Sequence, residues 1–301
     1  MKVKIAFFGT PLFAREILEL LSSSHQIVAV ITQPDRPFGR KQELKASEVK
    51  EYALTQNYPI YQPQSLDDTL LNELCTLGAE VFVVVAFGQF FPSSYLQARL
   101  CLNIHASLLP SMRGASPLQE MILQDERKFG VSVMKMDEGM DSGEIMALSY
   151  LQSPHNLSLE VLSHSLAHLG GKVLLKTLSL LPSIKGMKQI HCDATYCKKI
   201  KKEEGCVDFS SGKVIINKLL AFSSWPSVFL ENGLKITQAE FIPSKRSERV
   251  GEIVEIDESG VEVACLDGVL KVYEVQPPSK QKMKASDYIR GKRAKKGEIF
   301  C

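Results

Sequence analysis

Residues 81–87 read Val-Phe-Val-Val-Val-Ala-Phe, an unbroken apolar run that stops at Gly88. A strand with one solvated face alternates polar and apolar side chains, whereas a strand covered on both faces is apolar throughout. The run therefore predicts a central strand of a sheet with helices on both sides. It is much shorter than the roughly 18 apolar residues of a membrane span, and no stretch of the chain approaches that length.

Strand-like and helix-like segments alternate on both sides of this run. Further strands are expected at residues 2–9, 26–33, 60–62, 131–136 and 145–150, and helices at 11–23, 47–57, 66–77, 116–125 and 157–181. Such alternation predicts an α/β fold with a doubly wound, mostly parallel sheet. Ligands of these sheets bind at the carboxyl ends of the strands, so we expect the site in the turns after Phe8, Gln33, Phe87 and His105.

The pattern changes in the last third of the chain. Residues 185–204 lose their periodicity and become rich in lysine, which predicts a basic linker after a first domain of residues 1–184. Beyond it, short strand candidates at 228–230, 235–241, 250–256, 261–266 and 269–275 follow a helix candidate at 214–221. Residues 205–301 are therefore expected to form a small, OB-like β-barrel domain.

Charge and cysteine usage exclude several classes of protein. The net charge of the 301 residues is only +2, too small for a protein that coats polyanions. The basic excess lies at the end: residues 279–301 carry +6, which leaves −4 over the rest of the chain. The seven cysteines include no CxxC pair, so we expect reduced, structural thiols. Residues 1–10 are too short an apolar run for a signal peptide, and we expect a cytoplasmic protein.

The residues best suited to chemistry lie in two segments. Asn103 and His105 share one face of a strand because they are two residues apart, and Asp141 lies between glycines in a loop that follows a strand. An amide donor, an imidazole and a carboxylate could act together, although spacing alone also fits a structural hydrogen-bonding role. Phe8 to Pro11 lacks the GxGxxG pattern of a dinucleotide site. His164 and His168 have metal-ligand spacing without a third ligand, so no metal is expected.

Several segments together closely resemble the methionyl-tRNA formyltransferases. They are FFGTP (7–11), TQPDRPFGR (32–40), VVVAFG (83–88), NIHASLLP (103–110), RGASP (113–117), MDEGMDSGE (136–144), YCKKIKKEEGCVDF (196–209) and AFSSWP (221–226). The Asn-x-His-x-Ser-Leu-Leu-Pro pattern with a later Asp-x-Gly is shared by folate-dependent formyltransferases. The loop at 32–40 and the C-terminal domain are the features that specify a tRNA substrate.

The resemblance implies transfer of a formyl group from 10-formyltetrahydrofolate to the α-amino group of initiator methionyl-tRNA. An α-amino group has a reference pKa of about 7.7 to 8.0, so a useful fraction is already neutral and no strong base is needed. The implied catalytic set is Asn103, His105 and Asp141. Asn103 would donate to the developing oxyanion, His105 would donate there or move the proton, and Asp141 would orient His105 and share its charge.

The resemblance also implies binding residues. The folate would lie against Val84, Val85, Phe87, Gly88, Ser107, Leu108, Leu109, Pro110 and Asp141. The tRNA would meet Arg36, Arg40 and Lys41 in the first domain and Lys198, Lys199, Lys201 and Lys202 in the linker. Relatives commonly have Tyr at Phe87, and Arg followed by an aromatic residue at Ser111-Met112, so we expect this chain to lack one hydroxyl contact and one basic contact of the family. We expect a monomer with no metal, membrane or DNA partner.

Four rival interpretations remain: three kinds of enzyme that use the same motif, and a tRNA-binding protein whose catalytic site has decayed. Enzymes that formylate glycinamide ribonucleotide normally end near the first domain, whereas this chain continues for about a hundred residues. Relatives that act on amino-sugar nucleotides or hydrolyse the folate keep a second domain but lack the QPDRPxGR loop. A tRNA-binding module with a decayed site would not need Asn103, His105 and Asp141 together.

Overall fold

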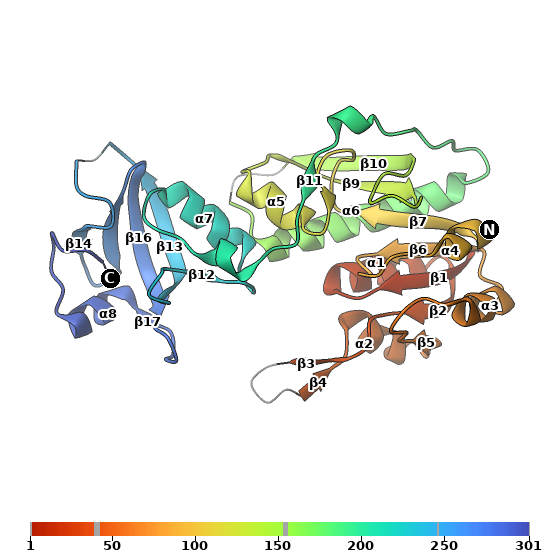
Figure 1. Cartoon of the computed structure of the whole chain (residues 1–301), viewed down its shortest axis with the longest axis horizontal. Helices are drawn as coiled ribbons and strands as arrows, with labels where there is room; N and C mark the ends of the chain where they lie inside the picture. Colours follow the sequence, from red (N-terminus) through yellow and green to blue (C-terminus); the bar gives the residue numbers. More distant parts are fainter. Residues whose placement is uncertain (1, 39–42, 153–155, 246, 301) are drawn as a thin grey trace. The chain divides into compact units, whose positions relative to one another are not determined.

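The computed structural model describes residues 2–38, 43–152, 156–245 and 247–300 (Figure 1). The chain divides into two compact units. The first, named the catalytic unit after the predicted catalytic residues that it contains, comprises Met1–Pro117, Lys128–Ser153 and Glu160–Cys197. The second, the C-terminal unit, comprises Leu118–Arg127, Pro154–Leu159 and Lys198–Cys301. The division at Cys197 places residues 185–197, most of the predicted linker, in the catalytic unit.

A seven-stranded sheet forms the centre of the catalytic unit (Figure 1). Its strands are β1 (Lys4–Gly9), β2 (Gln26–Ile31), β5 (Ile60–Tyr61), β6 (Val81–Val85), β7 (Leu100–His105), β9 (Lys128–Lys135) and β10 (Ile145–Gln152), in the order β10-β9-β7-β6-β1-β2-β5. The first five are parallel to one another, whereas β9 pairs antiparallel with β7 and β10 pairs antiparallel with β9. The direction of winding reverses between β1 and β6, so the carboxyl ends of these strands mark the expected ligand edge.

Helices cover both faces of this sheet, which explains why β6 is apolar at every position. The helices are α1 (Leu12–Ser22), α2 (Glu48–Thr55), α3 (Asp68–Thr76), α4 (Ser93–Ala98) and α6 (Leu159–Leu180). Helix α5 (Pro117–Leu123) begins in this unit and continues in the C-terminal unit. Phe82 and Val84 pack with α3 and with Tyr95 of α4. On the other face, a side chain at Gly170 of α6 would come within 3.0 Å of Ile104. All five residues of β6 are consequently buried.

The sequence did not predict the short elements β3 (Arg36–Phe38) and β4 (Glu43–Lys45), which pair as an antiparallel hairpin, nor helix α4. Residues 36, 37 and 43–45 are exposed, so these positions leave no apolar periodicity in the sequence that would reveal the hairpin. Side chains cap the neighbouring predicted helices: Ser47 Oγ accepts from Lys50 N at the start of α2, and Asp67 does the same for Leu70 N at α3.

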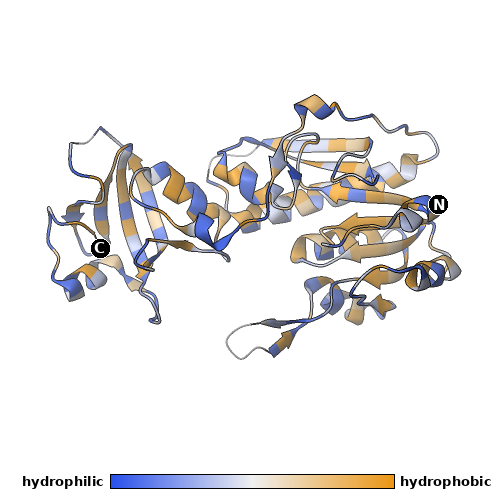
Figure 2. Ribbon diagram, viewed as in Figure 1, coloured by the Kyte–Doolittle hydropathy of each residue, from blue (hydrophilic) through white to orange (hydrophobic). Residues whose placement is uncertain are grey.

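The C-terminal unit is built on antiparallel strands (Figure 2 shows their apolar and polar positions). They are β12 (Val228–Phe229), β13 (Lys235–Pro243), β14 (Ile253–Ile256), β15 (Val261–Cys265), β16 (Gly268–Gln276) and β17 (Met283–Lys284). The main order is β12-β13-β16-β15-β14, and β17 pairs with β16. Helices α7 (Gly212–Ala221) and α8 (Ala285–Lys292) belong to the same unit, and Ile215 and Ile289 complete its core.

The predicted fold class is confirmed: a domain with a mostly parallel sheet precedes a domain of antiparallel strands. Within the described part of the chain, no helix is both long and apolar enough to cross a bilayer.

Candidate active site

Strand β7 presents Asn103 and His105 on the same face near its carboxyl end. Asn103 pairs with Val84 of β6 and Met134 of β9, so both neighbouring strands fix its backbone. Its side chain is half-buried, and no residue in the described ranges gives it a hydrogen bond. His105 is only 6% exposed. The strand therefore holds a free amide beside a nearly buried imidazole.

The His105 ring has one hydrogen-bonded nitrogen and one that faces a carboxylate. Nε2 lies 2.9 Å from Met112 O, and because a carbonyl can only accept, Nε2 is the donor. Nδ1 lies 3.7 Å from Asp141 Oδ2, which is an ion-pair distance rather than a hydrogen bond. A positive charge that forms on this imidazole would thus face Asp141, while Met112 O fixes the ring's Nε2–H.

The loop that carries Asp141 is held in shape by its own polar groups. Asp137 Oδ1 accepts from Gly139 N at 3.0 Å and from Ser142 Oγ at 2.8 Å. Asp141 itself has a φ of 50°, in the left-handed region. A Cβ at Gly143 would stand 1.8 Å from Lys135 O, so only glycine fits where the loop returns to the sheet. Asp141 Oδ2 then accepts from Gly114 N at 2.8 Å.

A short parallel pair joins the segment after β7 to the residues predicted as a linker. Strand β8 (Arg113–Gly114) pairs with β11 (Tyr196–Cys197). Thr195 Oγ1 also accepts from Met112 N at 2.8 Å. Gly114 has a φ of 117°, and a Cβ there would meet Cys197 O at 2.3 Å. Residues 195–197 are therefore part of the framework that holds the partners of His105 and Asp141, a role that sequence reasoning missed.

In the turn after β6, most side chains predicted to contact folate are buried, and the main chain is the exposed part. Val84, Val85 and Phe87 are buried, and the Phe87 ring lies in an aromatic cluster 5.5 Å from that of Phe8. The Phe87 carbonyl accepts from Thr10 Oγ1 at 3.2 Å and Gln33 Nε2 at 3.1 Å, which links the turns after β1, β2 and β6. Ala86 and Gly88 are exposed with φ values of 45° and 83°. Their peptide groups form the accessible edge of this turn.

The segment from Ser107 to Pro110 is tied to β9 by a buried serine. Ser132 Oγ donates to Ser107 O at 2.8 Å and accepts from Leu109 N at 3.0 Å. Ser107 Oγ in turn donates to Ser111 O at 2.6 Å. Ser107 and Leu109 are buried, whereas Leu108 and Pro110 are half-buried. The last two are the members of this segment whose side chains can meet a ligand.

The predicted tRNA residues of the catalytic unit lie at the β3–β4 hairpin. Arg36 is exposed, and its Nη2 donates to Gln33 Oε1 at 3.2 Å. Arg40 and Lys41 lie outside the described residues. At the hairpin base, Asp35 Oδ2 lies 2.6 Å from Lys50 Nζ, and Gln62 Nε2 donates to Asp35 Oδ1 at 2.8 Å. These hydrogen bonds, from Lys50 first and Gln62 second, hold the pKa of Asp35 below its usual value.

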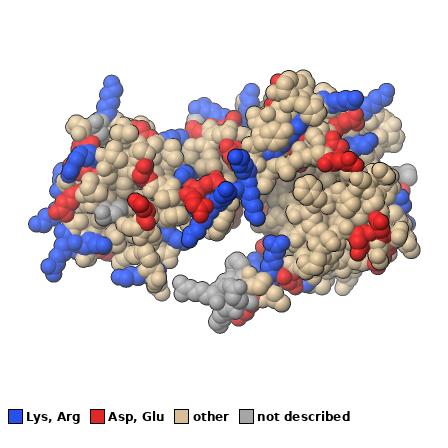
Figure 3. Space-filling model, in the orientation of Figure 1, with Lys and Arg blue, Asp and Glu red and all other residues tan. Residues whose placement is uncertain are grey.

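The four predicted tRNA lysines of the C-terminal unit, Lys198, Lys199, Lys201 and Lys202, are all exposed. In the basic tail, residues 279–301, three basic side chains form ion pairs: Lys282 with Glu274, Arg290 with Asp287 and Lys296 with Glu255. Figure 3 shows the basic side chains of this region interspersed with acidic ones. The tail's positive field is therefore partly neutralised within the unit.

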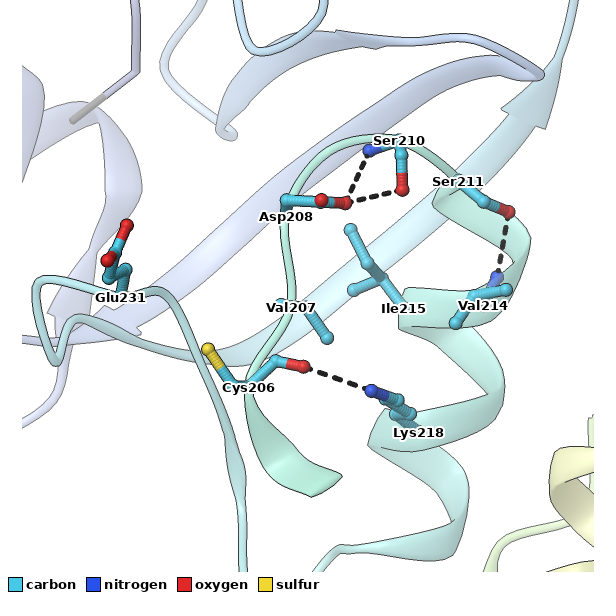
Figure 4. A pocket seen from close by; sticks show the side chains of 9 residues that line it. All are labelled: Cys206, Val207, Asp208, Ser210, Ser211, Val214, Ile215, Lys218 and Glu231. Atoms are coloured by element: carbon cyan, nitrogen blue, oxygen red, sulfur yellow. Dashed lines mark hydrogen bonds between the residues drawn. The ribbon is translucent and has the colours of Figure 1, made fainter. Parts of the chain in front are cut away.

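A separate hollow of about 500 Å³ lies in the C-terminal unit between the 206–211 segment and α7 (Figure 4). Lys218 Nζ donates across it to Cys206 O at 3.0 Å, and Ser211 Oγ caps the helix by accepting from Val214 N. None of the predicted catalytic residues lines it. Within the described ranges, no cluster of three or more His, Cys, Asp or Glu side chains could hold a metal ion.

Comparison with known proteins gives the family. Residues 1–178 match the formyl transferase model and residues 199–293 the model of the formyl transferase C-terminal domain. Methionyl-tRNA formyltransferase of Helicobacter pylori strain 26695 is 46% identical over 99% of this chain and 100% of its own. That of a Nitratiruptor species is 42% identical with the same coverage. An N-formyltransferase of Helicobacter canadensis, solved with folinic acid and dTDP-3-aminofucose, has the same fold, with 19% identity, a TM-score of 0.68 and coverage of 93% and 100%. The chain belongs to the methionyl-tRNA formyltransferase family.

Proposed function

We propose that this protein transfers the formyl group of 10-formyltetrahydrofolate to the α-amino group of initiator methionyl-tRNA. The observation that carries the proposal is the meeting of Asn103, His105 and Asp141 at the carboxyl ends of the strands, in a chain matched over its full length by methionyl-tRNA formyltransferases. We also propose that the protein acts as a monomer in the cytoplasm, where aminoacylated tRNA is available. We propose that DNA is not among its partners.

The residues present suit this chemistry. Asn103 supplies N–H donors that no residue in the described ranges occupies, so they are available to the oxygen of a formyl group as it gains negative charge. His105 can carry the proton that the amine loses and deliver it to the departing nitrogen. Asp141 faces Nδ1 at 3.7 Å and stabilises the imidazolium form during that transfer.

The turn after β6 suits the folate co-substrate. The exposed peptide groups of Ala86 and Gly88 offer donors and acceptors to a planar heterocycle with both, and Leu108 and Pro110 offer apolar contact on the β7 side. The buried ring of Phe87 supports this turn from beneath and supplies no polar contact.

The direct test is incubation of the purified protein with 10-formyltetrahydrofolate and methionyl-tRNA, followed by detection of N-formylmethionine after the ester is hydrolysed. We expect formylation that requires both substrates. Free methionine is the matched control acceptor, because it has the same α-amino group without the tRNA. Absence of product from methionyl-tRNA in a folded preparation that binds folate would overturn the proposal.

Replacement of Asp141 by asparagine should lower kcat and leave the folate dissociation constant nearly unchanged. The substitution keeps the side-chain shape and the oxygen that accepts from Gly114 N, but removes the charge that faces His105. Transient kinetics and folate titration measure the two effects separately. A loss confined to folate affinity would show that Asp141 is a folate ligand instead.

Replacement of Lys198, Lys199, Lys201 and Lys202 by glutamine should weaken tRNA binding and reduce its salt dependence. Each phosphate that is no longer neutralised by a lysine lowers the slope of log affinity against log salt by about 0.7 to 0.9. Binding between about 50 and 200 mM salt measures the slope. Lys172 and Lys176, exposed on α6, provide the control pair, whose replacement should leave the slope unchanged. An unaltered slope in the quadruple variant would exclude these lysines from the tRNA interface.

A further inference from the structure

Gln189 connects the Asp141 loop to the segment after β7. The residue is 6% exposed and lies in the stretch that the sequence predicts to be a linker. Its Nε2 donates to Asp141 O at 2.9 Å and to Gly143 O at 2.7 Å. Its Oε1 accepts from Arg113 Nε at 3.1 Å and Arg113 Nη2 at 2.6 Å. The amide thus uses both of its N–H groups and both lone pairs of its oxygen.

Arg113, on the other side of this amide, is the largest of the fully buried side chains among the described residues, at 2% exposure. Its remaining guanidinium contacts run from Nη1 to His191 Nδ1 at 3.3 Å and to the Tyr196 hydroxyl at 3.5 Å. No carboxylate pairs with it among the described residues. A buried cation needs its hydrogen bonds satisfied, so Gln189, which accepts two of them, fixes where Arg113 lies.

The backbone around Arg113 contacts both His105 and Asp141. Met112, before it, accepts the Nε2–H of His105, and Gly114, after it, donates to the Asp141 carboxylate. The contacts therefore close a ring: Gln189 holds the main chain of Asp141 on one side and the side chain of Arg113 on the other. The same three-residue segment then positions the His105 ring and the Asp141 carboxylate relative to each other.

We infer that Gln189 is a positioning residue for the reaction, which sets the separation of His105 and Asp141 without touching a substrate. The inference rests on the proposed function of this site. Catalytic geometry is sensitive to small displacements, since an error of about 1 Å can cost about a hundredfold in rate. Loss of the Gln189 hydrogen bonds should accordingly lower kcat and spare substrate binding.

The discriminating variant is Gln189→Glu, which keeps the length and the acceptors for Arg113 but has no N–H groups for Asp141 O and Gly143 O. We expect kcat to fall by about 10- to 100-fold. The KM values for 10-formyltetrahydrofolate and methionyl-tRNA should stay within about threefold. In protein labelled at histidine, the ring resonances of His105 should move, because its carboxylate neighbour moves.

Thr177→Val is the matched control. Thr177 is equally buried in the same unit, at 1% exposure, and its Oγ1 donates to Val173 O within α6, so the variant loses a buried hydrogen bond remote from Asp141. Its kcat and the His105 resonances should match those of the wild type. Thermal unfolding of both variants verifies that each is folded under the assay conditions.

The inference is overturned if Gln189→Glu keeps kcat within about twofold of the wild type, if the His105 resonances do not move, or if the Thr177→Val control shows an equal loss of kcat. If Gln189→Glu does not fold, the same measurements and criteria are applied to Gln189→Met, which is uncharged and similar in length. The resonance readout needs no turnover. A wild-type protein without formyl transfer would therefore refute the proposed function, whereas unmoved resonances would refute the Gln189 role alone.

Discussion

Replacement of His105 by alanine should lower kcat by about 10² to 10⁴, the usual size of a general acid–base contribution. The ring lies where β7 ends, with Nε2 bonded to Met112 O and Nδ1 facing Asp141, and no second imidazole in the described residues shares that position. Without it, the proton lost by the attacking amine has no carrier fixed beside the reacting atoms. Rapid-quench measurement of formyl transfer at saturating substrates reports this step directly.

The matched control is His164→Ala. His164 lies on α6, is exposed, and pairs with Glu16 at 2.9 Å, which raises the pKa of His164. We expect its replacement to leave kcat unchanged. A folded His105→Ala protein that binds folate and turns over within about threefold of the wild type would remove His105 from the mechanism.

Asn103→Asp should lower kcat by about 10² to 10³, as does the loss of an oxyanion donor in other acyl-transfer enzymes. The substitution preserves the shape of the side chain and replaces its N–H donors by a carboxylate, which repels a developing oxyanion. Since the amide has no partner among the described residues, no internal hydrogen bond is lost with it. The stability of the variant, measured by thermal unfolding, should therefore change little.

Asn72→Asp, at an exposed position of α3, introduces the same change of charge away from the sheet edge. It should leave kcat at the wild-type value. If Asn103→Asp and Asn72→Asp were equally active, the charge alone would be harmless at Asn103, and no oxyanion would form beside it.

Buried strands could be predicted from the sequence because burial leaves a direct trace in composition. Strand β6 has helices against both faces, so every position from Val81 to Val85 is apolar. The same logic identified β1 and β2, and the two-residue spacing placed Asn103 and His105 on one face of a strand. Strands β9 and β10 were also predicted, but their antiparallel pairing, of β9 with β7 and of β10 with β9, is not encoded in a local pattern.

The missed parts of the site are short and polar. Strands β8 and β11 have two residues each, too few for any periodicity, and pair only because the tertiary fold brings them together. The sequence predicts a basic linker over residues 185–204, yet Gln189 and Thr195 are bonded into the catalytic unit. Arg113 opens the RGASP motif, and a single arginine beside a glycine gives no indication that it is buried.

The prediction for Asp141 placed it near the imidazole through its loop but did not foresee how the ring is oriented. Met112 O, whose residue has a φ of 57°, accepts the Nε2–H of His105 and so selects which nitrogen is protonated. A backbone carbonyl has no sequence signature, because every residue carries one. Such contacts can only be found once the fold places the loop.

The choice of acceptor tests the account most directly, because the Helicobacter canadensis N-formyltransferase shares this fold and was solved with an amino-sugar nucleotide. Purified protein should be given limiting 10-formyltetrahydrofolate with equimolar methionyl-tRNA and dTDP-3-aminofucose in one reaction, and both products quantified. We predict that the formyl group is recovered on methionyl-tRNA. Recovery on the amino sugar would contradict the account.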